Sequence, residues 1–593
     1  MPASRFSRLG LIALLLAVLL VPLTSIVPLF WVTLADTIGM AALVALGLVL
    51  LTGVGGMTSF GQAAFVGFGA YTAAVLSLDY GVSGWLTLPA SLAVTGLAAA
   101  ALGLVTVRLS GHYLPLGTLA WGLAFFYLFG NLDILGTHDG LSGIPALTIG
   151  SYAFTDARSF WIIVFIGLVA TFWATQNLLN SRIGRAIRAL RQSSSAAEAF
   201  GIDTVRVKLA VFIYAAVLAG LSGWMFAYFQ RAVAPSSFGL SRGIDYLMMA
   251  VVGGSGQVYG ALAGAILVTL TENWLQDLMP KLFGGIGGTE IIVFGIGLVL
   301  VLQTAREGLW PHVAALVDRW RADPPAPPDA EPLPRRALPP PGTPLLAAAH
   351  LSKHFGGLVA VNDVSWVVPA GRIVGLIGPN GAGKSTTFNL VSGLARATSG
   401  EVTFNGTRIE AMAARRIARL GLARSFQHVK VVPDMSVIDN VALGASLRGK
   451  AGFLAAMLRF DRAEESRLMA EARRQVERVG LAEVMHRPAG TLALGQLRVL
   501  EIARALALDP MLVLLDEPAA GLRHKEKEAL ARLLDRLRKE GVAVLLVEHD
   551  MDFVMTLTDH LVVLNFGTRI AEGTPAEVRA DAAVIAAYLG GAP

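Results

Sequence analysis

Long apolar runs fill the first half of the chain and constrain its fold more than any other feature. A helix needs about 17–25 apolar residues to cross the hydrocarbon core of a bilayer, and runs near that length recur up to about Gln303. A single soluble core is therefore excluded, and the first half is predicted to be a polytopic α-helical membrane domain. The candidate spans are Leu9–Trp31, Thr33–Val54, Phe60–Leu78, Trp85–Val107, Tyr113–Phe129, Trp161–Leu179, Leu209–Phe229, Tyr246–Leu270 and Ile286–Leu302.

Charged residues orient these spans. The segment Ser181–Arg191 contains four arginines, and such segments face the cytoplasm. If the second half of the chain is also cytoplasmic, an even number of crossings separates Arg191 from Arg306, although three candidate spans lie between them. Tyr246–Leu270 contains Gly253-Gly254-Ser255-Gly256, a cluster of poor helix formers, so we expect a broken or re-entrant segment there. The sequence thus predicts about eight full spans.

Composition excludes several other classes of protein. Apolar residues make up 54% of the 593 residues and charged residues only 15%, a balance that indicates surrounding membrane lipid. The net charge of +6 is interpreted as an excess of basic residues in cytoplasmic loops, and no nucleic-acid partner is expected. The chain has no cysteine, which rules out disulfides, thiolate metal sites and cysteine nucleophiles.

The composition changes along the chain and divides it into three parts. Residues 1–317 are predicted to form the transmembrane domain, residues 318–345 a linker, and residues 346–593 a globular domain. The stretch Ala322–Pro344 is rich in proline and has no core-forming pattern, so we expect an extended, semi-rigid tether. At about 3.1 Å per residue it would reach some tens of ångströms without fixing the pose of the domain that it carries.

A nucleotide-binding motif opens the globular domain. The strand pattern Arg372–Ile377 runs directly into a glycine-rich loop of the form G-x-x-x-x-G-K-S, and a helical pattern follows. Backbone N–H groups of such a loop wrap phosphates, Lys384 reaches the β- and γ-phosphates, and the Ser385 hydroxyl is a ligand for Mg²⁺. The predicted nucleotide-binding residues are Gly378, Pro379, Asn380, Gly381, Ala382, Gly383, Lys384, Ser385 and Thr386.

Two further buried-strand patterns end in polar residues. Leu512–Leu515 leads into Asp516 and Glu517, which are predicted to hold Mg²⁺ through water and to orient and deprotonate the attacking water, respectively. Ala543–Val547 leads to His549, which fits a sensor that hydrogen-bonds both the γ-phosphate and Glu517. Glu517 and His549 are therefore the candidate catalytic residues.

The order of these motifs resembles the ATP-binding-cassette (ABC) family, from about Leu346 to the C-terminus. Leu492-Ala-Leu-Gly-Gln496 looks like its signature loop, Arg424-Ser-Phe-Gln427 looks like its Q-loop, and Phe355 sits where the family stacks an aromatic ring on adenine. The resemblance implies an α/β P-loop ATPase fold, ATP and Mg²⁺ as cofactors, and two such domains that close face to face. The nucleotide contacts that it implies include Leu492, Ala493, Gly495, Gln496 and Gln427, with Gln427 also beside the metal.

Two positions depart from the family pattern. Ala493 replaces the usual signature serine, which removes one hydroxyl donor at a cost on the order of 1 kcal/mol. Arg523 stands near the position where many cassettes have the aspartate of a Ser-Ala-Leu-Asp sequence, which puts the contact made by that aspartate between subunits in doubt.

Both halves are similar to the Liv-type branched-chain amino acid transporters. The similar stretches are Glu517–Leu522, Val584–Gly590, Gly67–Thr72, Asp139–Pro145 and Gly253–Gly256. The cytoplasmic segment from Gly184–Ala186 through Ala196–Gly201 is similar to the coupling helix that sits in the Q-loop groove. The resemblance implies ATP-driven import of branched-chain or related hydrophobic amino acids across the bacterial inner membrane, with the ATPase domain in the cytoplasm. It also implies a periplasmic substrate-binding protein, and a second permease and cassette that come from this chain or from paralogues.

Alternative functions differ in how well they fit the sequence. Import of urea or short-chain amides stays open, because that subfamily shares the permease and cassette patterns. An exporter is disfavoured by the importer-like coupling segment after Arg182 and by the Liv-type spans. A membrane-anchored regulatory ATPase would not need so many spans.

Overall fold

The computed structural model describes residues 3–107, 109, 113–283, 289–304, 308–318 and 330–589 and divides into two compact units. Unit 1 comprises Met1–Leu178 and Val205–Asp323. Unit 2 comprises Leu179–Thr204 and Pro324–Pro593, so it includes a short segment from between two apolar helices.

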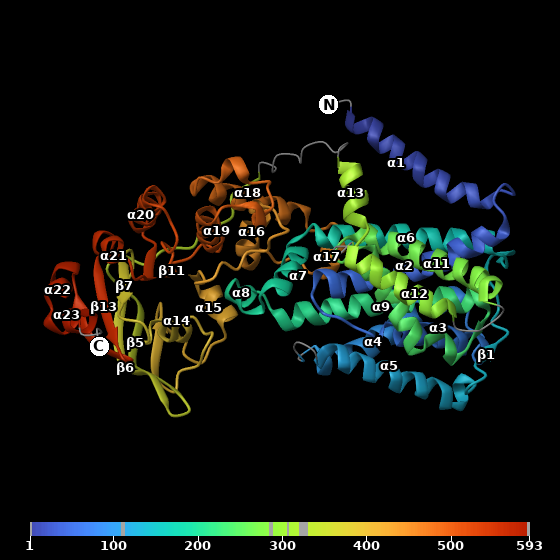
Figure 1. Ribbon diagram of the computed structural model, residues 1–593, viewed down its shortest axis with the longest axis horizontal. Helices are drawn as coiled ribbons and strands as arrows, with labels where there is room; N and C mark the ends of the chain where they lie inside the picture. The colour runs from blue at the N-terminus through green and yellow to red at the C-terminus, as the bar shows by residue number, and fades with distance from the viewer. Residues whose placement is uncertain are drawn as a thin grey trace. The chain divides into compact units, whose positions relative to one another are not determined.

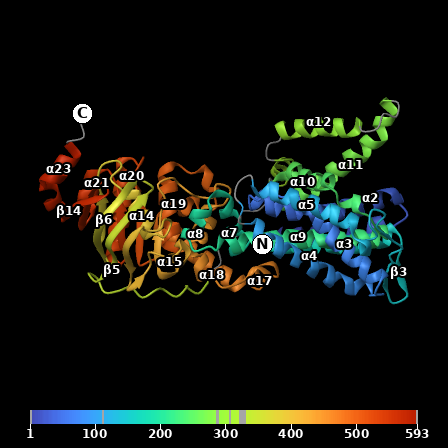
Figure 2. The same cartoon turned by 90° about the horizontal axis from the view of Figure 1, so that it is seen from below.

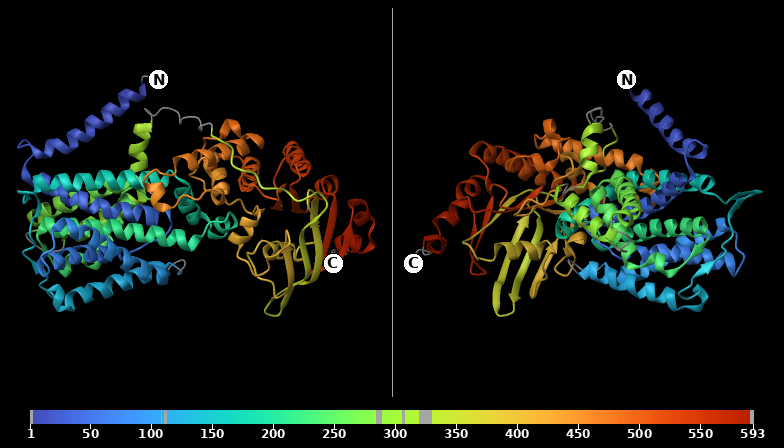
Figure 3. Two further views of the ribbon diagram at one scale, coloured as in Figure 1. Left: turned by 180° about the vertical axis from the view of Figure 1, so that it is seen from behind. Right: turned by 45° about the vertical axis from the view of Figure 1, so that its right-hand side comes forward.

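Unit 1 is built of apolar helices, most of which run side by side in a bundle (Figure 3). Its helices are α1 (Ala3–Leu20), α2 (Leu29–Leu48, continued by a π-helical turn, Val49–Val54), α3 (Gln62–Leu78), α4 (Gly84–Thr106), α5 (Tyr113–Asn131), α6 (Ala157–Leu179), α9 (Thr204–Gln230), α10 (Leu240–Gly254), α11 (Val258–Phe283), α12 (Thr289–Thr304) and α13 (Trp310–Asp318). Short antiparallel pairs join β1 (Leu141–Ser142) to β4 (Ala232–Val233) and β2 (Leu147–Ile149) to β3 (Tyr152–Phe154).

The predicted polytopic helical domain is confirmed, with differences in its spans. In the described part of the chain, six helices are long and apolar enough to cross a membrane, where about eight spans were expected. The predicted first span, Leu9–Trp31, is wrong in its extent because the helix ends at Leu20 and α2 starts after Pro28, and a proline cannot continue a helix without losing a hydrogen bond. The six are Leu29–Val54, Gly84–Thr106, Tyr113–Asn131, Ala157–Leu179, Thr204–Gln230 and Val258–Lys281.

The expected break in Tyr246–Leu270 is present. Helix α10 ends at Gly254 and α11 begins at Val258, and Gly254 and Gly256 have φ angles of 129° and 94°, which glycine adopts readily. The two helices also pack backbone to backbone, since a Cβ atom built on Gly253 would lie 1.8 Å from the carbonyl oxygen of Gly260. The glycines therefore serve both the break and the close approach of the helices.

Unit 2 is built on a mostly parallel sheet in the order β10-β11-β12-β7-β13-β14 (Figure 1). Every residue of β7, β11 and β12 is buried, as expected of parallel strands covered on both faces. Because these strands run parallel, their carboxyl ends meet at one edge, where ligands bind in open α/β sheets. The strands are β10 (Leu422–Arg424), β11 (Leu512–Asp516), β12 (Ala543–Val547), β7 (Ile373–Ile377), β13 (His560–Asn565) and β14 (Thr568–Gly573).

A second, antiparallel sheet and two groups of helices complete unit 2 (Figure 2). The sheet has the order β6-β5-β8-β9, with β5 (Pro344–Phe355), β6 (Leu358–Pro369), β8 (Ser399–Phe404) and β9 (Thr407–Arg408). Helices α16 (Val437–Gly444), α18 (Arg462–Arg478) and α19 (Leu494–Ala507) share one apolar core, and we call them the helical subdomain. The other helices are α7 (Arg182–Gln192), α8 (Ser194–Ala199), α14 (Lys384–Val391), α15 (Ala414–Leu420), α17 (Phe453–Met457), α20 (His524–Lys539), α21 (Met551–Leu557), α22 (Pro575–Ala580) and α23 (Ala582–Leu589).

The proline-rich segment differs from a free tether where it is described. Residues 319–329 lie outside the described part; residues 330–340 form neither helix nor strand, residues 341–343 form a turn, and the whole stretch belongs to unit 2. Leu333 is buried in the core of the helical subdomain, and the backbone N–H of Arg336 donates to Asp509 Oδ2 over 2.5 Å. Arg448 donates to the carbonyl of Pro334 over 2.9 Å. The second part of the predicted linker is therefore fixed by side chains of the ATPase region.

Candidate nucleotide-binding and coupling site

The glycine-rich loop connects β7 to α14 and has the backbone conformation of a phosphate-binding loop. Gly378, Gly381 and Gly383 have φ angles of 150°, 80° and 96°. A Cβ atom on Gly378 would lie 2.1 Å from the carbonyl oxygen of Leu564, so no larger residue fits there. Successive backbone N–H groups in such a turn form a concavity that binds anions. Pro379 and Ala382 lie within this loop, and Asn380 is exposed on it.

Lys384 begins α14 and folds back over the loop. Its ammonium donates to the carbonyl oxygens of Gly378 and Pro379 over 2.7 and 2.9 Å. Burial lowers the pKa of Lys384, and the carboxylates of Glu517 and Asp516 oppose this shift. Ser385 and Thr386 follow on the first turn of the helix, with Ser385 exposed.

Asp516 ends β11 and is only 3% exposed. Its backbone N–H donates to Ser425 Oγ over 3.2 Å, and its Oδ2 lies 3.7 Å from an Arg424 nitrogen. Its Oδ1 is buried and has no hydrogen-bond partner in the described structure. Burial raises the pKa of Asp516, and Arg424 opposes that shift. A buried carboxylate oxygen is costly without a partner, and hard cations such as Mg²⁺ take oxygen ligands, so this site fits Mg²⁺.

Glu517 and His549 come together at the edge of the sheet. Glu517 has a positive φ of 47°, and its backbone N–H donates to the carbonyl of Val547 over 2.9 Å, which fixes it to the neighbouring strand. His549 Nδ1 lies 3.9 Å from Glu517 Oε1, beyond hydrogen-bonding distance. The predicted pair is thus adjacent without the predicted hydrogen bond. Catalytic contacts of this kind commonly tighten only when the substrate is bound.

Glu548 is a buried carboxylate to which the sequence pattern gave no role. It is 1% exposed and accepts hydrogen bonds from the backbone N–H groups of Ala519 and His549 over 2.6 and 3.2 Å. Burial raises its pKa. It therefore joins the turn after Glu517 to the segment that carries His549. The acidic residue directly after a buried strand was the signal that could have identified it.

The signature loop leads into α19. Ala493 precedes the helix without a side-chain cap, and its backbone N–H donates to Gln496 Oε1 over 3.3 Å. Gly495 is buried, and a Cβ atom there would lie 2.6 Å from Glu526 Oε1 at the start of α20. Leu492 is 9% exposed and packs in the core of the helical subdomain. Glu526 also accepts from the backbone N–H of Arg523 over 2.8 Å.

Phe355 and Gln427 lie on the surface of unit 2. The Phe355 ring is 52% exposed at the end of β5, and Lys353 Nζ lies 4.9 Å from its centre. Gln427 is exposed and follows Phe426, which is almost fully buried. The side chains of Phe355 and Gln427 are thus both accessible to a nucleotide or to a neighbouring domain.

Helix α8 packs against the Q-loop inside unit 2. Ala196 and Ala199 form an apolar cluster with Phe426, next to Gln427. The Phe200 ring lies 4.4 Å from the guanidinium of the buried Arg504 on α19. The sequence predicted Ala196–Gly201 in the Q-loop groove, and this contact is present.

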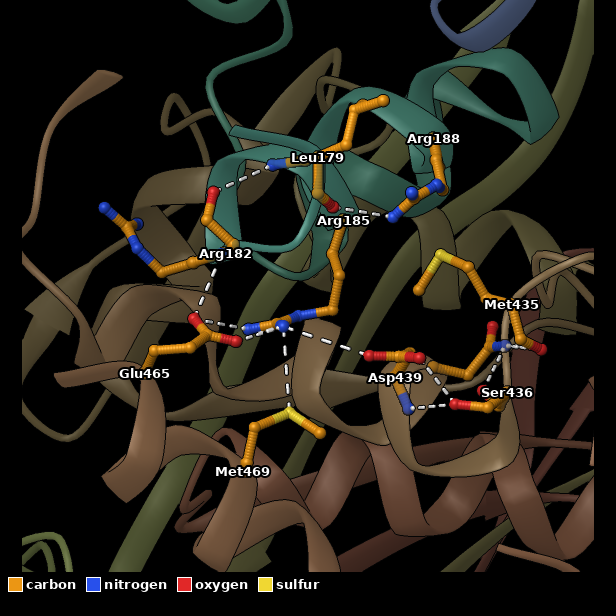
Figure 4. Close-up of polar contacts among 12 residues, drawn as sticks. Leu179, Arg182, Arg185, Arg188, Met435, Ser436, Asp439, Glu465 and Met469 are labelled. Carbon is orange, nitrogen blue, oxygen red and sulfur yellow. Dashed lines mark hydrogen bonds and ion pairs between the residues drawn. The ribbon is translucent and has the colours of Figure 1, made fainter. Parts of the chain in front are cut away.

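Helix α7 binds the helical subdomain through arginines (Figure 4). Both terminal nitrogens of Arg185 donate to the carboxylate of Glu465, one of them to Oε2 over 3.1 Å, and Arg185 is 3% exposed. The backbone N–H of Arg182 donates to the same Oε2 over 3.1 Å, and its guanidinium donates to the carbonyl of Ser446 over 2.9 Å. In the sequence, these arginines indicated the topology and, through the family resemblance, a coupling segment, but no ion pair with the ATPase region. Their spacing of three residues, which places them on one helix face, was the missed signal.

Comparisons with known proteins identify the family. Residues 30–302 match the family described as branched-chain amino acid transport system / permease component, residues 361–520 the ABC transporter family, and residues 568–593 the branched-chain amino acid ATP-binding cassette transporter family. The ATP-binding protein BraF of Pseudomonas aeruginosa is 43% identical over 250 residues, which cover 42% of this chain and 98% of BraF. The chain belongs to the branched-chain amino acid ABC transporter family.

Other similar proteins also match the ATP-binding half of this ABC transporter. The high-affinity branched-chain amino acid transport ATP-binding protein LivG of Salmonella typhimurium is 44% identical over 251 residues, or 42% of this chain and 98% of LivG. A solved nucleotide-free ATP-binding cassette is 30% identical and covers 42% of this chain and 99% of its own length, with a TM-score of 0.38.

The predicted fusion of a permease to an ATP-binding cassette is confirmed by these matches. The protein is an ABC transporter with an ATPase domain that binds ATP. It is a membrane protein with this domain on the cytoplasmic side, and its family implies a partner subunit and a substrate-binding protein.

Proposed function

We propose that this protein imports branched-chain amino acids across the bacterial inner membrane and supplies both the permease and the ATPase. The names of the relatives BraF and LivG support this substrate class. One observation supports the coupling of ATP hydrolysis to amino-acid transport. Residues 179–204 run from the last residue of one apolar helix to the first residue of another, yet they pack in one unit with the ATPase residues and contact the Q-loop.

The nucleotide site supports a role for each predicted residue. The loop from Gly378 to Thr386, with Lys384, binds the phosphates, and Phe355 stacks on adenine. Asp516, Ser385 and Gln427 hold Mg²⁺, which neutralises charge on the phosphates when bound. Glu517 holds and deprotonates the attacking water, and His549, adjacent at 3.9 Å, orients Glu517.

The signature loop supports a two-cassette motor. Leu492, Ala493, Gly495 and Gln496 stand at the N-terminal end of α19, where backbone N–H groups point outward and favour an anion. We propose that this end completes the ATP site of a second cassette, supplied by a second copy of this chain or by a paralogue. A periplasmic substrate-binding protein delivers the amino acid.

Uptake of radiolabelled leucine into proteoliposomes, with the partner subunits and the binding protein present, tests the proposal. Lys384→Ala and Glu517→Gln are each expected to abolish ATP-dependent uptake, because they remove the phosphate contact and the base. Lys539→Ala, at an exposed lysine of α20, is the matched control and should transport normally.

Two results would change the proposal. Unchanged leucine uptake in both variants would remove the ATPase assignment. Uptake of urea or short-chain amides, with none of leucine, would replace the substrate while leaving the motor in place.

A further inference from the structure

Arg424 is a buried cation between the nucleotide site and the Q-loop. It is the last residue of β10, 5% exposed, and it precedes the Q-loop residue Phe426 by two positions. In the sequence it stood out only as part of the Q-loop pattern. A buried guanidinium is expensive unless its donors and charge are matched, so its contacts indicate what it does.

On the nucleotide side, Arg424 contacts two elements of the ATP site. One terminal nitrogen lies 3.7 Å from Asp516 Oδ2. The other donates to Asn389 Oδ1 over 2.8 Å and to Ser392 Oγ over 2.6 Å, at the end of the helix that begins with Lys384. One side chain therefore ties the phosphate-loop helix to the carboxylate at the end of β11.

On the other side, Arg424 contacts the ring that supports α8. Its guanidinium carbon lies 5.3 Å from the centre of the Phe426 ring, within the range of a cation–π interaction. Phe426 in turn packs against Ala196 and Ala199 of α8, and its carbonyl accepts from Arg498 over 3.1 Å. A continuous series of contacts thus runs from α8 through Phe426 and Arg424 to Asp516.

The two oxygens of Asp516 are in different surroundings along this series. Oδ2 faces Arg424, whereas Oδ1 is buried without a hydrogen-bond partner in the described structure. Partners of this kind orient a metal-binding carboxylate, and their loss typically weakens metal binding by about 10–100-fold.

We propose that Arg424 is a positioning residue that holds the Asp516 carboxylate in its metal-binding orientation and makes that orientation depend on the seating of α8 against Phe426. This inference rests on the proposed metal-binding role of Asp516. It adds a direct route from α8 to the ATP site. If Arg424 only joined α14 to β11, its loss would affect nucleotide and metal binding alike.

The test uses the full chain in lipid nanodiscs and measures binding rather than turnover. Mn²⁺ affinity is measured by electron paramagnetic resonance with a non-hydrolysable ATP analogue, and affinity for a fluorescent ATP analogue is measured without divalent cations. Arg424→Met should weaken Mn²⁺ binding by about tenfold, while metal-free nucleotide affinity changes by less than about twofold. Arg424→Lys, which keeps the charge, should recover most of the loss. Arg416→Met, at an exposed arginine of α15, is the matched control.

Phe426→Leu tests the link to α8 and remains informative if Arg424→Met does not fold. It removes the ring face but keeps most of the apolar volume, and should weaken Mn²⁺ binding about threefold. Asp516→Asn distinguishes a failure of the inference about Arg424 from a failure of the proposed metal site. If Asp516→Asn loses Mn²⁺ but Arg424→Met and Phe426→Leu bind it as the wild type does, the inference is wrong and the proposed site stands. If Asp516→Asn also binds normally, both are wrong. Equal losses of metal and metal-free nucleotide in Arg424→Met, with no recovery in Arg424→Lys, would leave only a structural role.

Discussion

Removal of the Arg185 guanidinium should release α7 from the helical subdomain. Arg185 is 3% exposed and makes two hydrogen bonds to Glu465, whose side chain is 19% exposed. Loss of one partner of a fully buried pair costs about 3–5 kcal/mol. Because water reaches Glu465, we expect a smaller cost of about 2 kcal/mol for Arg185→Met, or a factor of about 30 in the equilibrium between docked and undocked α7.

Hydrogen–deuterium exchange of the backbone amides of α7 measures this change directly. Exchange through local opening should accelerate by about 30-fold in Arg185→Met. Arg462→Met, at an exposed arginine of α18, should leave it unchanged. A double variant that also carries Glu465→Gln, which keeps an oxygen for the Arg182 backbone N–H, should be little worse than Arg185→Met alone, because the charges of Arg185 and Glu465 act as a pair. Unchanged exchange in Arg185→Met, or additive effects in the double variant, would show that the Arg185–Glu465 pair does not hold α7 in place.

Three further predictions concern other parts of the chain. Leu333→Ala should lower the stability of the cassette by about 2–3 kcal/mol, seen as a lower thermal unfolding midpoint, because Leu333 fills the core of the helical subdomain. Gly253→Ala should reduce the yield of folded protein, since its Cβ would meet the backbone of α11 at 1.8 Å, whereas Gly295→Ala, with no atom within 4 Å, should not. Lys527 lowers the pKa of Asp550 from 3.8, so the stability that this carboxylate contributes is complete above pH 3.8 and is lost as pH falls through its folded value. Unfolding midpoints of Asp550→Asn should therefore depend less on pH in that acidic range.

Local patterns made much of this structure predictable. The phosphate loop and Asp516 follow buried strands, and parallel strands bring their carboxyl ends to one edge whatever the rest of the fold does. The break near Gly254 was predictable because four weak helix formers in a row cost more than a helix in that segment could recover.

Contacts between segments that lie far apart in the sequence could not be predicted in the same way. Arg185 and Glu465 are 280 positions apart, and nothing in either local pattern specifies the other. Likewise, a proline-rich composition predicts an extended backbone but not that Leu333 enters an apolar core. No periodic pattern in the sequence predicted the role of Arg424, because that role depends on three elements that come together only in the folded unit.

The most direct test of coupling between ATP hydrolysis and transport places a bulky residue between α8 and the Q-loop. Ala199 is 5% exposed and packs on Phe426, so Ala199→Trp should separate the two surfaces. Leucine uptake and phosphate release are measured in the same proteoliposomes, with Ser195→Trp, at an exposed position of α8, as the control. At saturating Mg²⁺, which offsets the weaker metal binding expected when α8 leaves Phe426, we expect Ala199→Trp to hydrolyse ATP while its uptake falls at least about tenfold. Uptake per ATP equal to that of the wild type would contradict the claim that ATP hydrolysis drives transport through this contact.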